Sequence, residues 1–392
     1  MRLCDDPAMR STDVVVIGAG CIGLASAIAL AGRGTKVILV ERGLPGAANS
    51  TLTGGGIRQQ FGSELNVRLS QLSAETWDGF EERFGVDPLF RRIGYLFLAR
   101  TAETAAALAA QVELQNRLGV DSELLDEEEI DRRWPALVDR GFRGAGFRAS
   151  DGWANHHRII DGLVRGAVAA GIELIVGTEA LALDLTSGRL SGVTTTAGRI
   201  RADAVLLATG PWVAVLLDPW NLSVPVTAHR HELLIVEPAE AYPEGLPWLI
   251  GVDDGVHTRS DADGRALVGG FLGEDREVDP DRYSMRADHA WTRAVLAAAD
   301  RVFGVVGPAA RIRHGWAGLY PSTPDRHPII DGLADGLYVA LGFSGTGLMH
   351  APAAGQLATE LIVDGKVRSV DSELLSASRF GSQIVPGEST SF

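Results

Sequence analysis

The sequence predicts an α/β protein in which a Rossmann-like nucleotide-binding domain is joined to a second, α+β domain on a mostly antiparallel sheet. Three observations predict this fold class. An apolar run at residues 14–17 leads directly into the glycine-rich segment 18–23, GAGCIG, and then into a helical run. A second apolar run, residues 37–40, ends in an acid, Glu41. Near the C-terminus, a strand-like segment again leads into a glycine-rich turn, residues 342–347, and a helix.

The first glycine-rich segment has the spacing of a dinucleotide-binding fingerprint, because Glu41 follows Gly18 by 23 residues. Gly18 allows the tight turn after the strand, Gly20 lets the backbone approach a pyrophosphate, and Gly23 lets the helix pack closely on the sheet. Free N–H groups at the helix N-terminus favour the pyrophosphate. Glu41 would accept hydrogen bonds from a ribose, which disfavours a 2′-phosphate. One NAD does not explain the second glycine turn, which suits a longer ligand held at both ends.

Composition excludes several classes of function. The chain has 392 residues, enough for two domains, and a formal net charge of −14 without a polybasic run, so neither nucleic acid nor an anionic membrane surface is an expected partner. The two cysteines, Cys4 and Cys21, are too few for a zinc cluster, and neither a disulfide nor a metal site is expected. No apolar run approaches the roughly 20 residues of a membrane span. We therefore expect a cytoplasmic protein without an integral membrane segment.

The middle of the chain predicts the second domain, because strands dominate from residue 225 onward and one helix follows at residues 287–303. The expected nucleotide-binding domain is discontinuous and takes residues 12–88, 145–224 and 314–375. The expected second domain takes residues 89–144 and 225–313. Residues 1–11 and 376–392 are expected to be loose tails.

Four blocks, residues 14–43, 54–61, 206–212 and 315–352, together resemble the D-amino-acid oxidase superfamily of FAD-dependent oxidoreductases. The resemblance is closest to the branch of sarcosine oxidase (β subunit) and glycine oxidase. It implies FAD and oxidation of the C–N bond of an amino acid or secondary amine, with hydride transfer to flavin N5 and an imine as product. The implied partners are a small amine or amino-acid substrate and oxygen or another electron acceptor. A homo-oligomer or a partner subunit is also open.

The fingerprint and the resemblance together give the expected FAD site. The second glycine turn would lie against the flavin ring, where the N-terminus of its helix favours negative charge on the reduced flavin. The expected cofactor-binding residues are Gly18, Gly20, Cys21, Ile22, Gly23, Glu41, Arg42, Ser50, Gly54, Gly55, Gly56, Gly210, Trp212, Gly318, Gly342, Ser344, Gly345, Thr346 and Gly347. Sarcosine oxidases of this branch carry a flavin-linking cysteine at the position of Gly318, and residues 50–56 contain no histidine. The FAD is therefore expected to be non-covalent.

The resemblance also indicates the substrate side. An arginine at the position of Arg58 pairs with the substrate carboxylate in the sarcosine oxidase branch, and a guanidinium fork suits a carboxylate. Two lysines of that branch are replaced here, one by Met349 and the oxygen-activating one by Leu267. The first replacement argues against simple sarcosine oxidation, and the second against oxygen as the acceptor. The expected catalytic residues are Arg58, His257, Arg259 and His350, with His229 and His231 as further hydrogen-bonding candidates.

Two alternatives stay open at the level of sequence. A 2-hydroxy-acid oxidoreductase of the same superfamily would need a base for the hydroxyl proton, and His257 or His350 could serve. An FAD-bearing subunit of a hetero-oligomeric amino-acid dehydrogenase is the other alternative, because the blocks around residues 54–61 and Trp316 resemble β subunits. The second glycine turn argues against a plain NAD dehydrogenase.

Overall fold

The nucleotide-binding half is built on a mostly parallel sheet. In a computed structural model, which describes residues 10–137, 140–186, 189–273, 275–307, 309–381 and 387–388, the strand order is β17-β18-β11-β1-β2-β8. Its strands are β1 (Arg10–Ile17), β2 (Val37–Val40), β8 (Glu173–Ile175), β9 (Ala180–Thr186), β10 (Arg189–Thr195), β11 (Gly198–Leu207), β17 (Ile329–Ala334) and β18 (Leu337–Leu341). β17 is antiparallel to β18, and the antiparallel strands β9 and β10 extend from β11. Parallel pairing of β1 with β2 ends at Ile17 and Val40, which places Gly18 and Glu41 at the same edge of the sheet.

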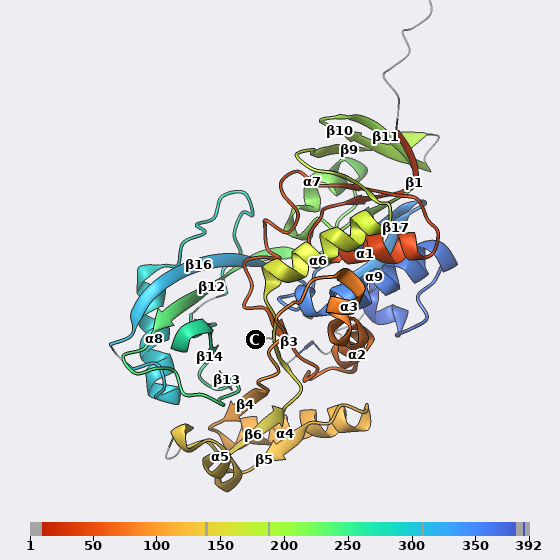
Figure 1. Cartoon of the computed structure of the whole chain (residues 1–392). Coiled ribbons are helices and arrows are strands. Elements are labelled where there is room, and N and C mark those ends of the chain that lie inside the picture. The colour runs from red at the N-terminus through yellow and green to blue at the C-terminus, as the bar shows by residue number, and fades with distance from the viewer. Residues whose placement is uncertain are drawn as a thin grey trace, which may run out of the picture.

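Helices cover one face of this sheet, where α1 packs on α9 and α6, and α2 packs on α9 (Figure 1). The α-helices of both halves, in chain order, are α1 (Cys21–Gly32), α2 (Glu64–Asp78), α3 (Phe80–Phe84), α4 (Ala102–Arg117), α5 (Glu127–Arg133), α6 (His156–Ala169), α7 (Ala214–Leu217), α8 (His289–Phe303) and α9 (Gly347–Asp364). The long helices α2, α4, α6 and α8 begin at the capping side chains Ser63, Thr101, Asn155 and Asp288. In the described part of the chain, α1 and α9 begin with neither a side-chain cap nor an acid in the first turn. These two N-termini are therefore suited to an anionic ligand.

The second half is a mainly antiparallel sheet in the order β16-β12-β15-β14-β13-β4-β6-β5, in which β13 and β4 pair in parallel (Figure 1). Its strands are β4 (Tyr95–Ala99), β5 (Glu123–Leu125), β6 (Gly144–Arg148), β12 (Thr227–Glu237), β13 (Trp248–Gly251), β14 (Val256–Ser260), β15 (Ala266–Gly270) and β16 (Arg311–Ser322), while β3 (Gly56–Ile57) and β7 (Gly152–Trp153) form a small separate pair. α8 packs on β14 and β15 over one apolar core. Tyr95, Trp248 and Leu267 belong to a separate core cluster, and they approach the segment 54–56 of the other half.

Two strands lie in a different sheet from the expected one. The boundaries at residues 145 and 314 assign β6 and most of β16 to the nucleotide-binding domain, but β6 pairs with β4 and β5, and β16 pairs with β12. Both boundaries are therefore wrong by about one strand. Such pairing joins segments that are far apart in sequence and leaves no local pattern. β16 also connects the halves, because Ser322 at its end forms a bridge with Phe343 of the second glycine turn.

Residues 377–381 and 387–388 are bound to the fold, which corrects the expectation of a loose tail at these positions, while residues 382–386 and 389–392 lie outside the described residues. Residues 377–381 form a 3₁₀ helix in which the buried Arg379 donates from Nε and Nη2 to the carboxylate of Asp325, at 2.7 and 3.0 Å. Glu388 is buried as well. Composition missed this anchoring because Ser and Gly are common in loose tails, whereas single charged residues provide the attachment here.

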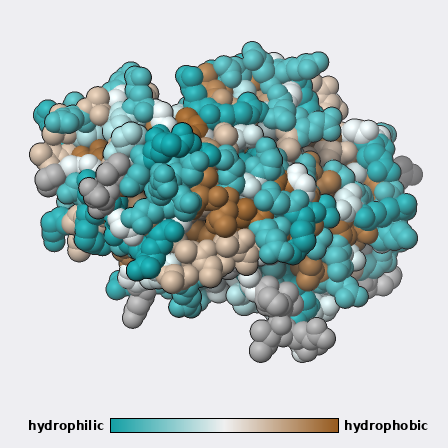
Figure 2. Space-filling model, turned by 90° about the horizontal axis from the view of Figure 1, so that it is seen from below, coloured by the Kyte–Doolittle hydropathy of each residue, from teal (hydrophilic) through white to brown (hydrophobic). Residues whose placement is uncertain are grey.

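At the N-terminus, β1 already begins at Arg10, and residues 1–9, with Cys4, lie outside the described residues. Cys21 is a buried free thiol. No described helix has both the length and the apolar character needed to cross a membrane. The face seen from below Figure 1 is mainly hydrophilic around a smaller apolar area near its centre (Figure 2).

Candidate functional site

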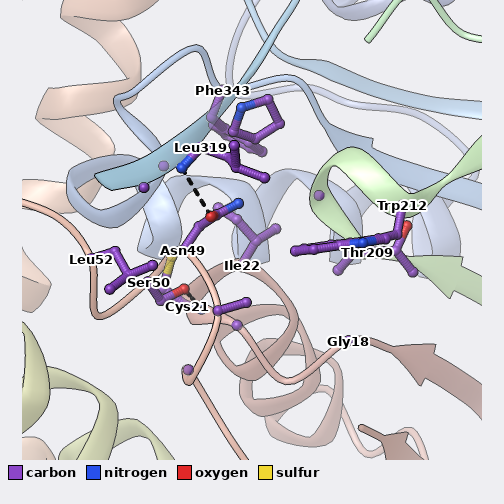
Figure 3. Close-up of a pocket in the computed structure, with 18 of the residues that line it drawn as sticks. Gly18, Cys21, Ile22, Asn49, Ser50, Leu52, Thr209, Trp212, Leu319 and Phe343 are labelled. Carbon is purple, nitrogen blue, oxygen red and sulfur yellow. Dashed lines mark hydrogen bonds between the residues drawn. The ribbon is translucent and has the colours of Figure 1, made fainter. Parts of the chain in front are cut away.

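A main cavity runs from the nucleotide-binding sheet to the second sheet. Its lining begins at Glu41, passes the N-termini of α1 and α9, and ends at His257 and Tyr320. Figure 3 shows side chains from the start of α1, from residues 49–52 and from residues 209–212, which follow β11, facing this cavity. The expected cofactor-binding residues that line it are Gly18, Gly20, Cys21, Ile22, Glu41, Arg42, Ser50, Gly210, Trp212, Gly318, Gly342, Gly345 and Gly347.

The first glycine turn leaves space for a ligand and allows close packing between β1 and α1. Gly18 has φ +101°, and a Cβ there would lie 2.6 Å from the carbonyl oxygen of Ala208, so a side chain does not fit. Gly23 lies outside the lining and packs against Gly18, which lets α1 approach the strand. The Cys21 N–H donates to Ser50 Oγ at 3.0 Å, and burial raises the pKa of the Cys21 thiol. Cys21 is therefore a neutral, packed thiol.

Glu41 is held by the backbone at one end of the cavity. Its carboxylate accepts hydrogen bonds from the N–H groups of Ala19 and Gly43, each at 2.7 Å. These bonds fix an acceptor at the end of β2, beside the N-terminus of α1. That is the position in which a fingerprint acid meets ribose hydroxyls.

Arg42, Trp212 and Asp281 form a cluster at the same end. The Arg42 guanidinium carbon lies 4.4 Å from the centroid of the Trp212 ring, and Trp212 Nε1 donates to Asp281 at 2.8 Å. All three residues line the cavity, and Asp281 belongs to the segment between β15 and α8 of the second half. Sequence reasoning missed Asp281, because it lies in an irregular segment without a motif.

The second glycine turn leads into α9 from the other side of the cavity. Gly345 has φ +92°, and a Cβ there would lie 2.4 Å from the ring of Tyr320. Ser344 and Thr346 do not line the cavity. The Ser344 hydroxyl accepts from a backbone N–H at 3.2 Å, and the Thr346 hydroxyl donates to a carbonyl of the turn at 2.7 Å. These two residues therefore hold the turn, while Gly347 lines the cavity at the start of α9.

Arg259 and the segment 54–56 have a structural role, which corrects their assignment to the site. Gly54, Gly55 and Gly56 lie outside the cavity lining and pack closely on other parts of the chain, including the Trp248 and Tyr95 rings. Arg259 Nη2 donates to the Gly54 carbonyl at 3.0 Å, and the guanidinium lies 3.8 Å from the ring centroid of Trp153. Arg259 thus ties the glycine segment to the second sheet.

His350 is also misassigned as a catalytic residue. It is fully buried between α9 and α2, with Nε2 3.0 Å from Ser70 Oγ and its ring centroid 5.1 Å from that of Phe61. Burial and the charge of Arg58 lower the pKa of His350 to about 3. The ring lies outside the lining of the main cavity and is therefore a neutral packing residue.

His257, by contrast, lines the cavity as expected, and its protonation is fixed by a neighbour. Trp248 Nε1 lies 3.2 Å from His257 Nδ1 and donates to it. Because an indole N–H can only donate, Nδ1 is the unprotonated nitrogen and the neutral ring carries its proton on Nε2. Burial lowers the pKa of His257 to about 3, aided by Arg259 and His231. The ring is therefore a neutral hydrogen-bond donor through Nε2.

Aromatic rings complete this end of the cavity. The ring centroid of His231 lies 4.2 Å from that of Tyr320 and 4.9 Å from that of Phe271. Burial lowers the pKa of His231 to about 4, although Asp275 opposes the shift from 3.6 Å. Sequence reasoning missed Phe271 and Trp248, because an aromatic residue in an apolar strand is more often part of a core.

Arg58 lies outside the lining of the main cavity and borders a second one. Its side chain is 2% exposed, lies 4.0 Å from the centroid of the Phe61 ring and donates to the Gln60 carbonyl. Burial lowers the pKa of Arg58, while nearby groups that include Tyr320 oppose the shift. Met349 borders the same second cavity. The two positions that matched carboxylate-binding residues thus border the same second cavity.

These residues fit a dinucleotide with a ring system at its far end. Gly18 and Gly20 leave the backbone accessible, Glu41 presents a fixed acceptor, and two helix N-termini without side-chain caps face the same cavity. In addition, residues 13–361 match the model of a family described as DAO, FAD dependent oxidoreductase. The chain belongs to this family. FAD as the cofactor and the predicted superfamily are confirmed.

Individual relatives agree with this family. Glycine oxidase of Pseudomonas aeruginosa is 30% identical over 369 residues, which cover 90% of this chain and 95% of the relative. Sarcosine oxidase subunit beta of Rhodobacter capsulatus is 25% identical, and the match covers 90% of this chain and 85% of the relative. The crystal structure of L-proline dehydrogenase from P. horikoshii superposes with a TM-score of 0.86 at 29% identity, covering 95% of this chain and 99% of that one. The predicted α/β fold with two halves is confirmed.

Proposed function

We propose that this FAD-dependent oxidoreductase oxidises the C–N bond of an amino acid or secondary amine to an imine. The supporting observation is the hydrogen bond from Trp248 Nε1 to His257 Nδ1. A 2-hydroxy acid needs a base for its hydroxyl proton, and His257 Nε2 already carries a proton because Trp248 donates to Nδ1. A neutral amine brings its own lone pair and needs no such base. Relatives named for glycine, sarcosine and L-proline support the amine class.

Each end of the cavity has a proposed role. Glu41 and the N-terminus of α1 would hold the nucleotide, and FAD, when bound, supplies the hydride acceptor. The rings of His231 and Tyr320 would exclude water from the reacting carbon. His257 Nε2–H would donate a hydrogen bond at the same end. Arg58, which borders the second cavity, would hold a substrate carboxylate.

Anaerobic reduction of the enzyme-bound flavin tests the reaction. L-proline, sarcosine and glycine are compared with lactate, and the loss of oxidised-flavin absorbance is followed. We expect at least one amine to reduce the flavin and lactate to leave it oxidised. Reduction by lactate alone would overturn the proposal.

L-proline and pyrrolidine differ only in the carboxylate, so they test the proposed role of Arg58. Arg58→Lys should weaken L-proline binding at least tenfold and pyrrolidine binding less than threefold.

The FAD is proposed to be non-covalent. Gly318 lines the cavity and has no nucleophile, and the thiol of Cys21 is buried and neutral. Acid precipitation should therefore leave the flavin in the supernatant. Yellow colour that stays with the protein pellet contradicts this proposal.

A second candidate is the FAD-bearing subunit of a hetero-oligomeric amino-acid dehydrogenase. Leu267 is buried beside Trp248, at the position where the sarcosine oxidase branch has its oxygen-activating lysine. A relative named as a β subunit also supports this candidate. Reduction of an artificial dye in air without consumption of oxygen would favour a partner protein as the electron acceptor. Rapid oxygen consumption by the isolated chain would show that no partner protein is needed as acceptor. The cytoplasmic location stays a prediction.

A further inference from the structure

Glu388, near the C-terminus, contacts the segment that follows Arg58. Arg379 pairs with Asp325 through two hydrogen bonds, at 2.7 and 3.0 Å. Further on, the N–H of Glu388 donates to the carbonyl of the same Asp325 at 3.0 Å. The turn around Asp325 therefore fixes the C-terminal chain at two points. From this turn the Glu388 side chain reaches the start of α2, which follows the Arg58 segment directly.

The carboxylate of Glu388 meets several donors there. It accepts from the N–H of Gly62 at 2.8 Å, from the N–H and hydroxyl of Ser63 at 3.1 and 2.7 Å, and from Asn66 Nδ2 at 3.0 Å. Glu388 is 5% exposed, so these bonds replace its hydration. The Ser63 hydroxyl donates to Glu388, and it therefore accepts from His327 Nε2 at 3.0 Å. The negative charge also lies at the N-terminus of α2, where the helix dipole stabilises it.

This carboxylate holds the residues that place Arg58. Gly62 and Ser63 end the segment that starts at Arg58, and Arg58 packs on the ring of Phe61, directly before Gly62. A fixed Gly62–Ser63 turn therefore restricts where Phe61 and Arg58 can lie. The charge of Glu388 also acts on Arg58 and opposes the lowering of its pKa by burial.

We propose that Glu388 is a positioning residue that fixes the Arg58 segment from the C-terminal end of the chain. The link to substrate affinity rests on the proposed function, in which Arg58 holds the substrate carboxylate. Loss of the Glu388 carboxylate then loosens the segment and weakens binding of a carboxylate-bearing substrate. Binding of FAD does not change, because Gly62 and Ser63 lie outside the lining of the main cavity.

The test compares Glu388→Gln with Glu373→Gln. Glu373 is exposed in the same C-terminal region. Amide hydrogen exchange of the peptide covering residues 58–66 is followed in the FAD-loaded enzyme. We expect Glu388→Gln to speed exchange in this peptide at least tenfold and to leave the peptide covering α8 unchanged. Glu388→Asp should restore part of the protection. Equal exchange in the wild type and in Glu388→Gln would overturn the positioning role.

Anaerobic flavin reduction provides the second measurement. In Glu388→Gln, the dissociation constant for L-proline should rise at least fivefold, while that for pyrrolidine, the limiting rate and the FAD content stay within twofold. Faster exchange with unchanged L-proline affinity would overturn the link to substrate binding. If no amine reduces the wild type, the proposed function fails, and the exchange measurement alone decides whether Glu388 holds the segment.

Discussion

At the Glu41 end of the main cavity a ligand meets the glycine turn, the Glu41 carboxylate and the cluster of Arg42, Trp212 and Asp281, whereas at the His257 end it meets imidazole and aromatic rings. The glycine turn at the first end depends on the absence of a side chain, because a Cβ at Gly18 would lie 2.6 Å from Ala208 O. The second end depends on side chains that neighbours hold in place, as Trp248 holds His257. Backbone recognition suits a constant nucleotide, and side-chain recognition can change with the substrate.

The largest effect is expected at the backbone end. Gly18→Ala should weaken FAD binding at least 100-fold, because the added methyl group meets Ala208 O. Gly34→Ala is the matched control, since Gly34 also has positive φ, +81°, but its Cβ would have nothing within 4 Å. The control should change the FAD dissociation constant less than threefold, as measured by quenching of FAD fluorescence with apoprotein. Equal losses in both variants would mean that backbone strain alone is responsible.

A smaller effect at the same end is expected from Glu41→Gln. The amide keeps one acceptor oxygen but loses the charge that strengthens the bonds from Ala19 and Gly43. FAD binding should weaken about tenfold, which corresponds to about 1.4 kcal/mol. Glu173→Gln on the surface serves as the control. An unchanged FAD dissociation constant would contradict a role for Glu41 in binding the ribose.

At the ring end, Trp248→Phe should change catalysis and leave FAD binding intact. The variant keeps an aromatic ring but removes the donor that holds the His257 proton on Nε2. We expect the limiting rate of flavin reduction by an amine substrate to fall several-fold, with the FAD content unchanged. Trp134→Phe makes the same substitution in the core of the second half and should alter neither quantity. If the two variants behave alike, the hydrogen bond to His257 does not contribute to the reaction.

The last prediction concerns the stability of the fold against pH, a quantity separate from binding and catalysis. The pKa of His231 falls to about 4 in the folded protein, because burial and His229 outweigh Asp275. The unfolded chain, with a histidine pKa of about 6.5, binds more protons between pH 6.5 and 4, so His231 lowers the free energy of unfolding as pH falls through that window. One such group contributes a slope of at most about 1.4 kcal/mol per pH unit. His231→Gln should flatten the pH dependence measured by chemical denaturation, whereas exposed His314→Gln should not.

Local spacing made the backbone end predictable. Gly18, Gly20 and Glu41 lie in one strand–turn–helix–strand unit, so their order in the sequence already sets their arrangement in space. The second glycine turn was found for the same reason. The expectation that strands dominate after residue 225 also holds for His257 and Arg259, which both lie on β14 and are buried.

Non-local contacts account for what could not be predicted. Arg259 reaches the Gly54 carbonyl and not the cavity, and this depends on which segment lies over β14. His350 lies on α9, where side chains are buried on nearly every face, so periodicity gives no direction for it. Anchoring of the C-terminus by Glu388 depends on Gly62 and Ser63, more than 300 residues earlier in the chain.

The order of strands in the first sheet has a consequence for the way the chain folds. β11 lies between β1 and β18 and pairs in parallel with both, and these three strands come from the beginning, the middle and the end of the sequence. On the ribosome, the part of β11 that pairs with β18, residues 205–207, therefore stays without this partner until almost the whole protein has been made. Contacts of such long sequence separation form slowly. The second glycine turn follows β18 directly, so both glycine turns are in place only after β18 has joined the sheet. Uptake of the flavin therefore marks the completion of the sheet.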